Sequence, residues 1–186
     1  MANFSITNSS YITYGSTKAA MTTTFKTIVL VGVGSSVSGS GFPSGGAVSP
    51  YNPRRGKIYD ILIGTDSTPG DTVVEWDLAR ANTMLSSEVF IGALTSASSL
   101  FALDPADGVL TAFAINNSTA EVATYGAEAW SIGINQRASY RWVAAPGSEF
   151  VYAAVSSAGL GLRAMGPSGG GSFTGTVTGT VLLQEQ

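Results

Sequence analysis

The clearest constraint on the fold is a strict two-residue alternation near the end of the chain, in residues 172–184. One side of this segment carries only apolar residues and glycine: Phe173, Gly175, Val177, Gly179, Val181 and Leu183. The other side carries threonines: Thr174, Thr176, Thr178 and Thr180. A period of two is typical of a β-strand with one buried face. Because glycine weakens a strand unless a bulky group packs over it, we expect an aromatic ring such as Trp76 or Trp142 on this face.

Several further segments alternate in the same way and are separated by turn residues. They span residues 23–31, 57–65, 72–79, 139–144 and 149–153. The turns contain Pro-Gly pairs, in which proline presets φ and glycine accepts a positive φ. The only candidate helix, residues 81–100, is weakened by a run of Ser and Thr. Short strands joined by such turns predict an all-β fold, an antiparallel β-sandwich.

Two of these segments predict which side chains enter the core. In residues 57–65 we expect one face to carry Tyr59, Ile61 and Ile63. In residues 72–79 we expect one face to carry Val74, Trp76 and Leu78, and the other to carry Val73, Glu75 and Asp77. Paired carboxylates on one face fit glycoside hydrolysis, which needs separations of about 5–9.5 Å. The favoured interpretation of Glu75 and Asp77 is instead a solvent-facing polar edge opposite Trp76.

Two regions interrupt the strand pattern and define the expected domain organisation. Residues 1–22 are polar and rich in Ser and Thr, which indicates an extended N-terminal arm. Residues 32–56 are rich in Gly, Ser and Pro and predict a long loop, which in a compact domain is functional or mobile. The remaining chain, residues 23–186, is expected to form a single sandwich domain around that loop.

The composition excludes several function classes. The 186 residues include no Cys and no His, which excludes disulfides, thiolate or imidazole catalysis and ordinary zinc or haem sites. Nine Lys and Arg against twelve Asp and Glu give a net charge of -3, so no basic patch for nucleic acid is expected. No apolar run is long enough to span a bilayer, and the start of the chain does not resemble a secretory signal. We therefore expect no cofactor, no nucleic acid and no membrane partner.

The remaining polar and aromatic residues leave weaker alternatives. Four aspartates lie in predicted turns and offer calcium ligands, although turn formation alone explains them: Asp66, Asp71, Asp104 and Asp107. Three tryptophans and several tyrosines offer a sugar-binding platform, but on strands such residues more often lie in a core or subunit interface: Trp76, Trp130 and Trp142. Arg137 and Arg141 are expected to form ion pairs, with candidate partners Glu121, Glu128 and Glu149.

Several separated motifs resemble small phage and prophage proteins encoded among head genes. They lie in residues 55–64, 68–71, 102–107, 135–147 and 173–181. Over residues 20–186 the chain resembles the bacteriophage capsid decoration, or cement, proteins. This resemblance implies a jelly-roll-like sandwich on the outer surface of the virion, assembled in the host cytoplasm. It also implies a homo-oligomer, often a trimer, that braces the major capsid protein and has no catalytic residue. Residues 32–56 are longer and richer in glycine than is usual for that family.

The expected function is accordingly that of a structural virion protein, not an enzyme, which binds the capsid and stabilises the head. Charged residues make up only 11% of the chain, which suits a surface covered by subunit and capsid contacts. The candidate contact residues lie in the expected arm and the long loop: Tyr11, Tyr14, Phe42, Tyr51, Arg54 and Arg55. The alternative is a carbohydrate- or receptor-binding jelly-roll module on a phage tail or fibre.

Overall fold

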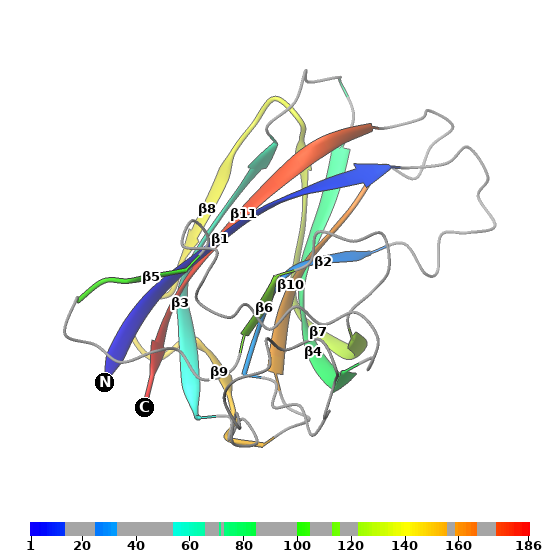
Figure 1. Ribbon diagram of the computed structural model, residues 1–186. Coiled ribbons are helices and arrows are strands. Elements are labelled where there is room, and N and C mark those ends of the chain that lie inside the picture. The colour runs from blue at the N-terminus through cyan, green and yellow to red at the C-terminus, as the bar shows by residue number, and fades with distance from the viewer. Residues whose placement is uncertain are drawn as a thin grey trace, which may run out of the picture.

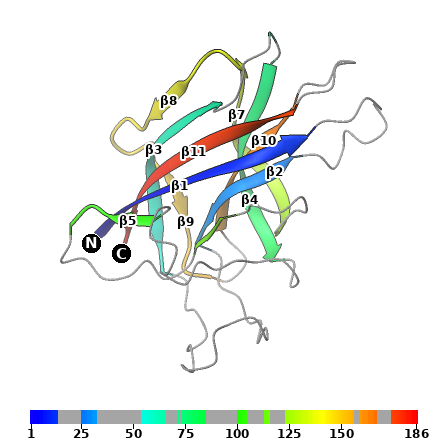
Figure 2. The same ribbon diagram turned by 45° about the horizontal axis from the view of Figure 1, so that its top comes forward.

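The computed structural model describes residues 1–13, 25–32, 54–65, 71, 73–84, 100–104, 113–115, 123–155, 159–166 and 174–186. These residues form eleven strands and no helix (Figure 1). The strands make two antiparallel sheets that share one hydrophobic core, and Figure 2 shows the two layers from a second direction. The predicted all-β fold, an antiparallel sandwich, is therefore confirmed.

The first sheet has six strands in the order β5-β1-β11-β3-β8, with β9 also paired to β3. These strands are β5 (Leu100–Ala102), β1 (Ala2–Thr13), β11 (Thr174–Glu185), β3 (Gly56–Thr65), β8 (Tyr140–Val143) and β9 (Phe150–Tyr152). The second sheet has five strands in the order β6-β2-β10-β4-β7. They are β6 (Phe113–Ile115), β2 (Lys26–Val31), β10 (Gly159–Met165), β4 (Val73–Met84) and β7 (Ala123–Asn135).

The N-terminal residues belong to the sandwich, which corrects the expectation of a separate arm over residues 1–22. Strand β1 pairs with β11 along its whole length, from Ala2 opposite Glu185 to Thr13 opposite Thr174. It lies between β5 and β11, and its side chains Phe4 and Ile6 are fully buried. Only one face of β1 enters the core, so its polar outer residues concealed the alternation. Residues 14–22 lie outside the described residues.

Within the described residues, the alternate residues of β11 that the sequence predicts to be buried do face the core. Four residues of the predicted apolar face are buried: Val177, Gly179, Val181 and Leu183. A Cβ atom at Gly179 would lie 2.9 Å from Leu162 Cδ2 and 3.6 Å from Trp76 Cζ3. The expected ring over this glycine is therefore Trp76, which is fully buried. Because Gly179 has no side chain, the tryptophan and Leu162 can approach the strand this closely.

A β-bulge changes the face predicted for β3. Leu182 pairs with Asp60, whereas the next residue, Leu183, pairs with Ile58. Tyr59 is the extra residue on β3, and an extra residue reverses the alternation beyond it. Ile61 and Ile63 are buried as predicted, but Ile58 takes the place expected for Tyr59, which is only half-buried.

Strand β7 has no counterpart among the predicted strands. Its thirteen residues include small residues such as Ala127, Ala129 and Gly133, which weaken the alternation of apolar and polar side chains. The candidate helix over residues 81–100 is wrong at its start, because residues 81–84 continue β4. A short turn connects β7 to β8, so the chain crosses from the second sheet to the first at this edge of the sandwich (Figure 2).

Candidate functional site

The predicted contact residues are only partly within the described residues. Tyr11 lies on β1 opposite Thr176, but its side chain is outside the described part of the structure, as are Tyr14, Phe42 and Tyr51. Arg54 and Arg55 are exposed at the start of β3. The Arg55 carbonyl accepts a hydrogen bond of 2.9 Å from the Gln186 amide, which ties this segment to the end of the chain.

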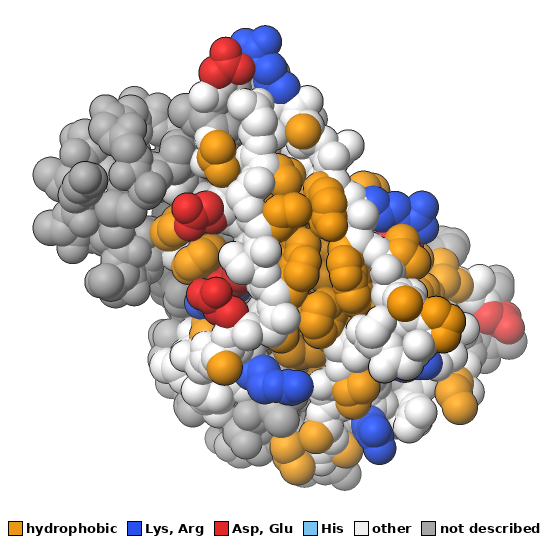
Figure 3. Space-filling model, turned by 180° about the vertical axis from the view of Figure 1, so that it is seen from behind, with side chains coloured by type: hydrophobic (Ala, Val, Ile, Leu, Met, Phe, Trp, Pro, Cys, Tyr) orange, Lys and Arg blue, Asp and Glu red, His pale blue; other side chains and the backbone are white. Residues whose placement is uncertain are grey.

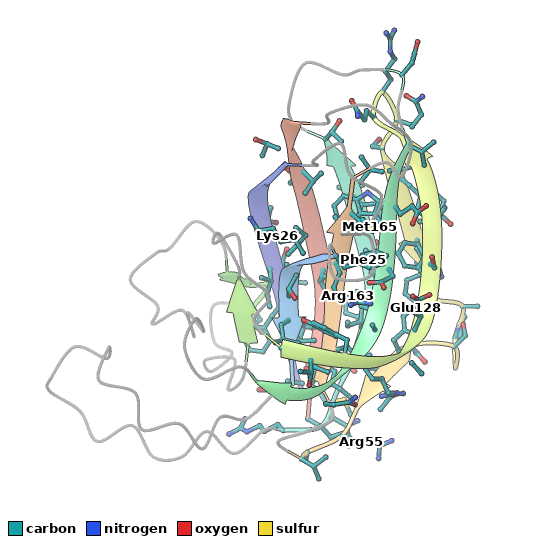
Figure 4. The ribbon with its side chains drawn as sticks, turned by 90° about the vertical axis from the view of Figure 1, so that its right-hand side faces the viewer. Phe25, Lys26, Arg55, Glu128, Arg163 and Met165 are labelled. Atoms are coloured by element: carbon teal, nitrogen blue, oxygen red, sulfur yellow. The ribbon has the colours of Figure 1, made fainter. Side chains whose placement is uncertain are left out.

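A buried ion pair occupies the outer face of the second sheet, where a solvent-facing polar edge was expected. Asp77 is fully buried, and Arg163 Nε donates to its Oδ1 at 2.8 Å. A second hydrogen bond joins Arg163 Nη2 to Asp77 Oδ2. The guanidinium carbon lies 4.6 Å from the Phe25 ring centre and 4.4 Å from that of Tyr125. Figure 4 shows Phe25, Arg163 and Glu128 on this face, with Arg55 well apart from them.

Burial controls the protonation of this carboxyl group. Burial, with a smaller contribution from the charge of Glu128, raises the pKa of Asp77, the hydrogen bond and charge of Arg163 oppose the rise, and the resulting pKa is about 6. Both carboxylate oxygens of Asp77 bond to one guanidinium, and that guanidinium lies against two aromatic rings. Asp77 thus has the surroundings of a structural ion pair, and Glu75, two residues earlier on β4, is only partly buried.

Tyr125 explains how this outer face is sealed. It comes from β7, and its hydroxyl forms a hydrogen bond of 2.5 Å with Thr27 Oγ1 on β2. Between these strands the ring lies against Gly161 of β10, where a Cβ atom would be only 2.5 Å from Tyr125 Cε1. The glycine therefore lets the ring lie flat across the sheet, and the ring in turn covers Arg163.

Arg137 and Arg141 are paired as predicted, but with different partners. Arg141 Nε donates to Asp60 Oδ1 at 3.0 Å, and Arg137 Nε lies 3.1 Å from Asp71 Oδ1. Glu149, a predicted partner, instead accepts from Lys57 at 3.2 Å. Glu128 lies on the opposite sheet from Arg141, and Glu121 is outside the described residues. Asp60, the partner of Arg141, is not among the predicted partners.

The turn aspartates gather no metal site in the described part of the chain. Asp71 is engaged by Arg137, Asp104 is exposed, and Asp66 and Asp107 lie outside the described residues. No group of three or more His, Cys, Asp or Glu side chains able to hold a metal ion occurs among the residues the structure describes. No helix of the length and apolarity needed to cross a membrane occurs among them either.

An apolar strip lies between the edge strands β7 and β8. Its five side chains pack against the core but stay partly exposed: Trp130, Ile132, Tyr140, Trp142 and Phe150. The rings of Trp130 and Tyr140 stack across the gap between the sheets with centres 6.1 Å apart. Those of Trp142 and Phe150 stack with centres 4.5 Å apart. Figure 3 shows this strip as a band of hydrophobic side chains between two lighter ridges.

The structure thus divides the three tryptophans considered for a sugar platform. Trp76 belongs to the closed core, whereas Trp130 and Trp142 belong to the exposed strip. The strands beside the strip carry exposed residues from Ala127 to Ala129 and at Ser131, Gly133 and Arg141. Such a surface suits contact with another apolar surface or an extended chain.

A second exposed surface is the outer face of the first sheet. Leu62 and Val143 are 44% and 58% exposed there, beside the ion pair of Asp60 and Arg141. Thr180 is opposite Leu62 in the ladder, and its hydroxyl lies 2.9 Å from that of Thr7. This face combines exposed aliphatic side chains with hydroxyl groups and a paired charge, as is usual at protein contacts.

Comparison with protein families and with curated proteins finds no relative of this chain. No protein-family model matches the chain, and no curated protein sequence matches it.

Proposed function

We propose that the protein is a structural component of a phage virion, a capsid decoration protein that binds the outer surface of the head and stabilises it as a homo-oligomer. The observation that carries the proposal is the outer face of the first sheet. Its exposed Leu62 and Val143 lie beside threonine hydroxyls and the Asp60–Arg141 pair. This mixture fits repeated contact with a protein surface.

The charged groups of the described residues support the same proposal. Four carboxylates are held in ion pairs with Lys or Arg, at Asp60, Asp71, Asp77 and Glu149. These pairs connect neighbouring strands or anchor turns, which is a structural use of charge. The resemblance of several motifs to phage head proteins is the basis for proposing the major capsid protein as the partner and the outer capsid surface as the location.

A sedimentation experiment tests the proposal. Purified protein is mixed with phage capsids that lack it and spun through a cushion, and binding in a fixed ratio to capsid subunits is expected. The variant Leu62→Asp is expected to abolish co-sedimentation, because it places a charge in the apolar part of the face. Val73→Asp is the matched control, since Val73 is 46% exposed on the other sheet.

Two outcomes would count against the proposal. Wild-type protein that stays in the supernatant at every capsid concentration would refute capsid binding. Binding that Leu62→Asp and Val73→Asp leave equally strong would remove the outer face of the first sheet from the account. Glycan-array binding by the wild-type protein, lost on Trp142→Ala, would favour the carbohydrate-binding alternative.

A further inference from the structure

The edge strand β7 is open to pairing. It is bonded to β4 on one side, and in the described part of the chain no strand pairs with its other side. Exposed residues lie along it at 126–129, 131, 133 and 135. An open edge presents a row of backbone N–H and C=O groups that can bond to another strand.

This edge lacks the devices that normally prevent such pairing. Natural edge strands are protected by charged residues, prolines or very short length. From Trp130 to Asn135 the strand contains no charged residue and no proline. Its ladder with β4 is regular over these residues, and the register shifts fall only before Trp130. The protected part of β7 is thus its first half, while the second half is regular in register and uncharged.

The apolar strip runs along the same part of β7. Trp130 and Ile132 point into it, opposite Leu78 and Trp76 of β4. The alternate residues Ser131 and Gly133 are exposed on the outer face. A partner that binds this edge must therefore form hydrogen bonds with the backbone groups of β7 and also cover the aromatic rings of the strip. A strand does both, whereas a sugar stacked on the rings would leave the backbone edge uncovered.

We propose that β7 pairs antiparallel with β7 of a second copy, around a two-fold axis at Ile132. The two five-stranded sheets then form one continuous sheet. Ile132 is opposite its own copy, Trp130 is opposite Ile134, and Ser131 is opposite Gly133. Apolar residues thus meet apolar residues in the strip, small residues meet on the outer face, and no like charges are opposed.

The two-fold axis explains why the strip is left open in one copy. An axis perpendicular to the sheet brings the β8 edges of both copies towards each other as well. The strip of one copy then faces the strip of the other, and their rings close a shared core. This inference rests on the homo-oligomer part of the proposed function and is independent of the capsid.

Two variants test the pairing by light scattering and cross-linking. Wild-type protein is expected at twice the chain mass of 19.0 kDa. Ser131→Lys places a lysine on the exposed face of the edge, and we expect the dimer dissociation constant to rise at least about tenfold. Ala154→Lys, at another exposed position, is the control and is expected to leave the dimer intact.

Cross-linking uses the absence of cysteine from the chain. Directly opposed residues have Cβ atoms about 4.5–5.5 Å apart, so mild oxidation of Ile132→Cys is expected to give a covalent dimer. Leu103→Cys, exposed beside β5, is the control for random collision and is expected to give no covalent dimer.

The outcomes separate this pairing from the capsid role. The pairing would be overturned if the wild-type protein were a monomer at every concentration, or a trimer that Ser131→Lys leaves unchanged. It would also be overturned if Ile132→Cys and Leu103→Cys cross-linked equally. So would a monomer that binds glycans through the strip. A monomer that still binds capsids refutes the pairing alone, and a β7 dimer that ignores capsids refutes only the capsid role.

Discussion

Asp77 and Arg163 are direct register partners across the β4–β10 ladder, and their side chains bond to each other on the outer face of that sheet. A buried charge pair at this position is unusual because the outer face of a sandwich normally meets water. Here the rings of Phe25 and Tyr125 both contact the guanidinium. The pair therefore joins β4, β10 and β7 with Phe25, the residue before β2, and makes the second sheet sensitive to changes at any of these residues.

The first prediction concerns pH. The pKa of Asp77 in the folded protein, about 6, lies above the ordinary value of 3.8, because burial disfavours the charged carboxylate. The folded state therefore binds this proton more tightly than the unfolded chain does. This group contributes stability that is complete below about pH 4 and is lost as the pH rises through about 6, at most about 3 kcal/mol.

Carboxyl titration by NMR measures this directly. A midpoint near 6 is expected for Asp77, and a midpoint below 4 would contradict the prediction. Unfolding by urea at a series of pH values provides the second readout. The free energy of unfolding of Asp77→Asn is expected to lack the decline that the wild-type protein shows between about pH 4 and pH 6.

The second prediction concerns removal of one partner of the pair. Arg163→Met leaves Asp77 buried without its cation, so at pH 7 we expect a loss of about 3–5 kcal/mol in unfolding free energy. The double variant with Asp77→Leu is expected to recover most of that loss, because no charge is then buried. Arg137→Met is the control: its exposed pair with Asp71 should contribute little. Equal losses for the single and double variants would contradict this account.

The third prediction concerns the contact of Tyr125 with Gly161. Gly161→Ala places a methyl group against the ring, and we expect a destabilisation of about 1–3 kcal/mol. In a Tyr125→Ala background, where the ring is absent, Gly161→Ala is expected to cause no further loss of unfolding free energy. Gly64→Ala is the matched control, since its nearest neighbour would be 3.6 Å away. A full thermodynamic cycle by chemical denaturation gives the coupling, and a coupling of zero would refute the close contact.

The fourth prediction concerns the N-terminal strand. Phe4→Ala should cost about 3–5 kcal/mol, because the ring is buried in the shared core. Deletion of residues 1–13 is expected to prevent folding, because it removes a whole inner strand. Met1, which is 80% exposed, can be removed without effect and serves as the control. Circular dichroism and thermal melts measure both; a truncated protein with a native melt would restore the idea of an arm.

The sequence predicts those parts of the fold in which one face is purely apolar. Val74, Trp76 and Leu78 are fully buried as expected, because their strand alternates without interruption. Tyr59 was placed on the wrong face, because a bulge depends on the partner strand and leaves no mark in the local pattern. Asp77 was expected in water because the rings that cover its partner come from distant segments of the chain.

For the apolar strip, the sequence predicts the kind of residue that forms it but not where the strip lies. Aromatic residues were recognised as material for a platform or an interface, but the strip depends on which edges the two sheets place together. Trp130 and Tyr140 are neighbours only because β7 and β8 lie at matching edges of opposite sheets. Strand β7 itself gave little signal, since small residues alternate with its larger ones. Tyr14, Phe42, Tyr51 and the side chain of Tyr11 lie outside the described part of the structure, so these contacts stay predictions.

The pairing of Ala2 with Glu185 has a practical consequence for attaching cargo. Both ends of the chain leave the sandwich at one corner (Figure 1), so a tag or foreign domain fused at either end would project from the same point. A short linker would join the two ends, and new ends could be opened in the exposed turn at Pro146 and Gly147. In such a permuted chain the fused domain would be attached at the turn between β8 and β9, while β1 and β11 stay paired.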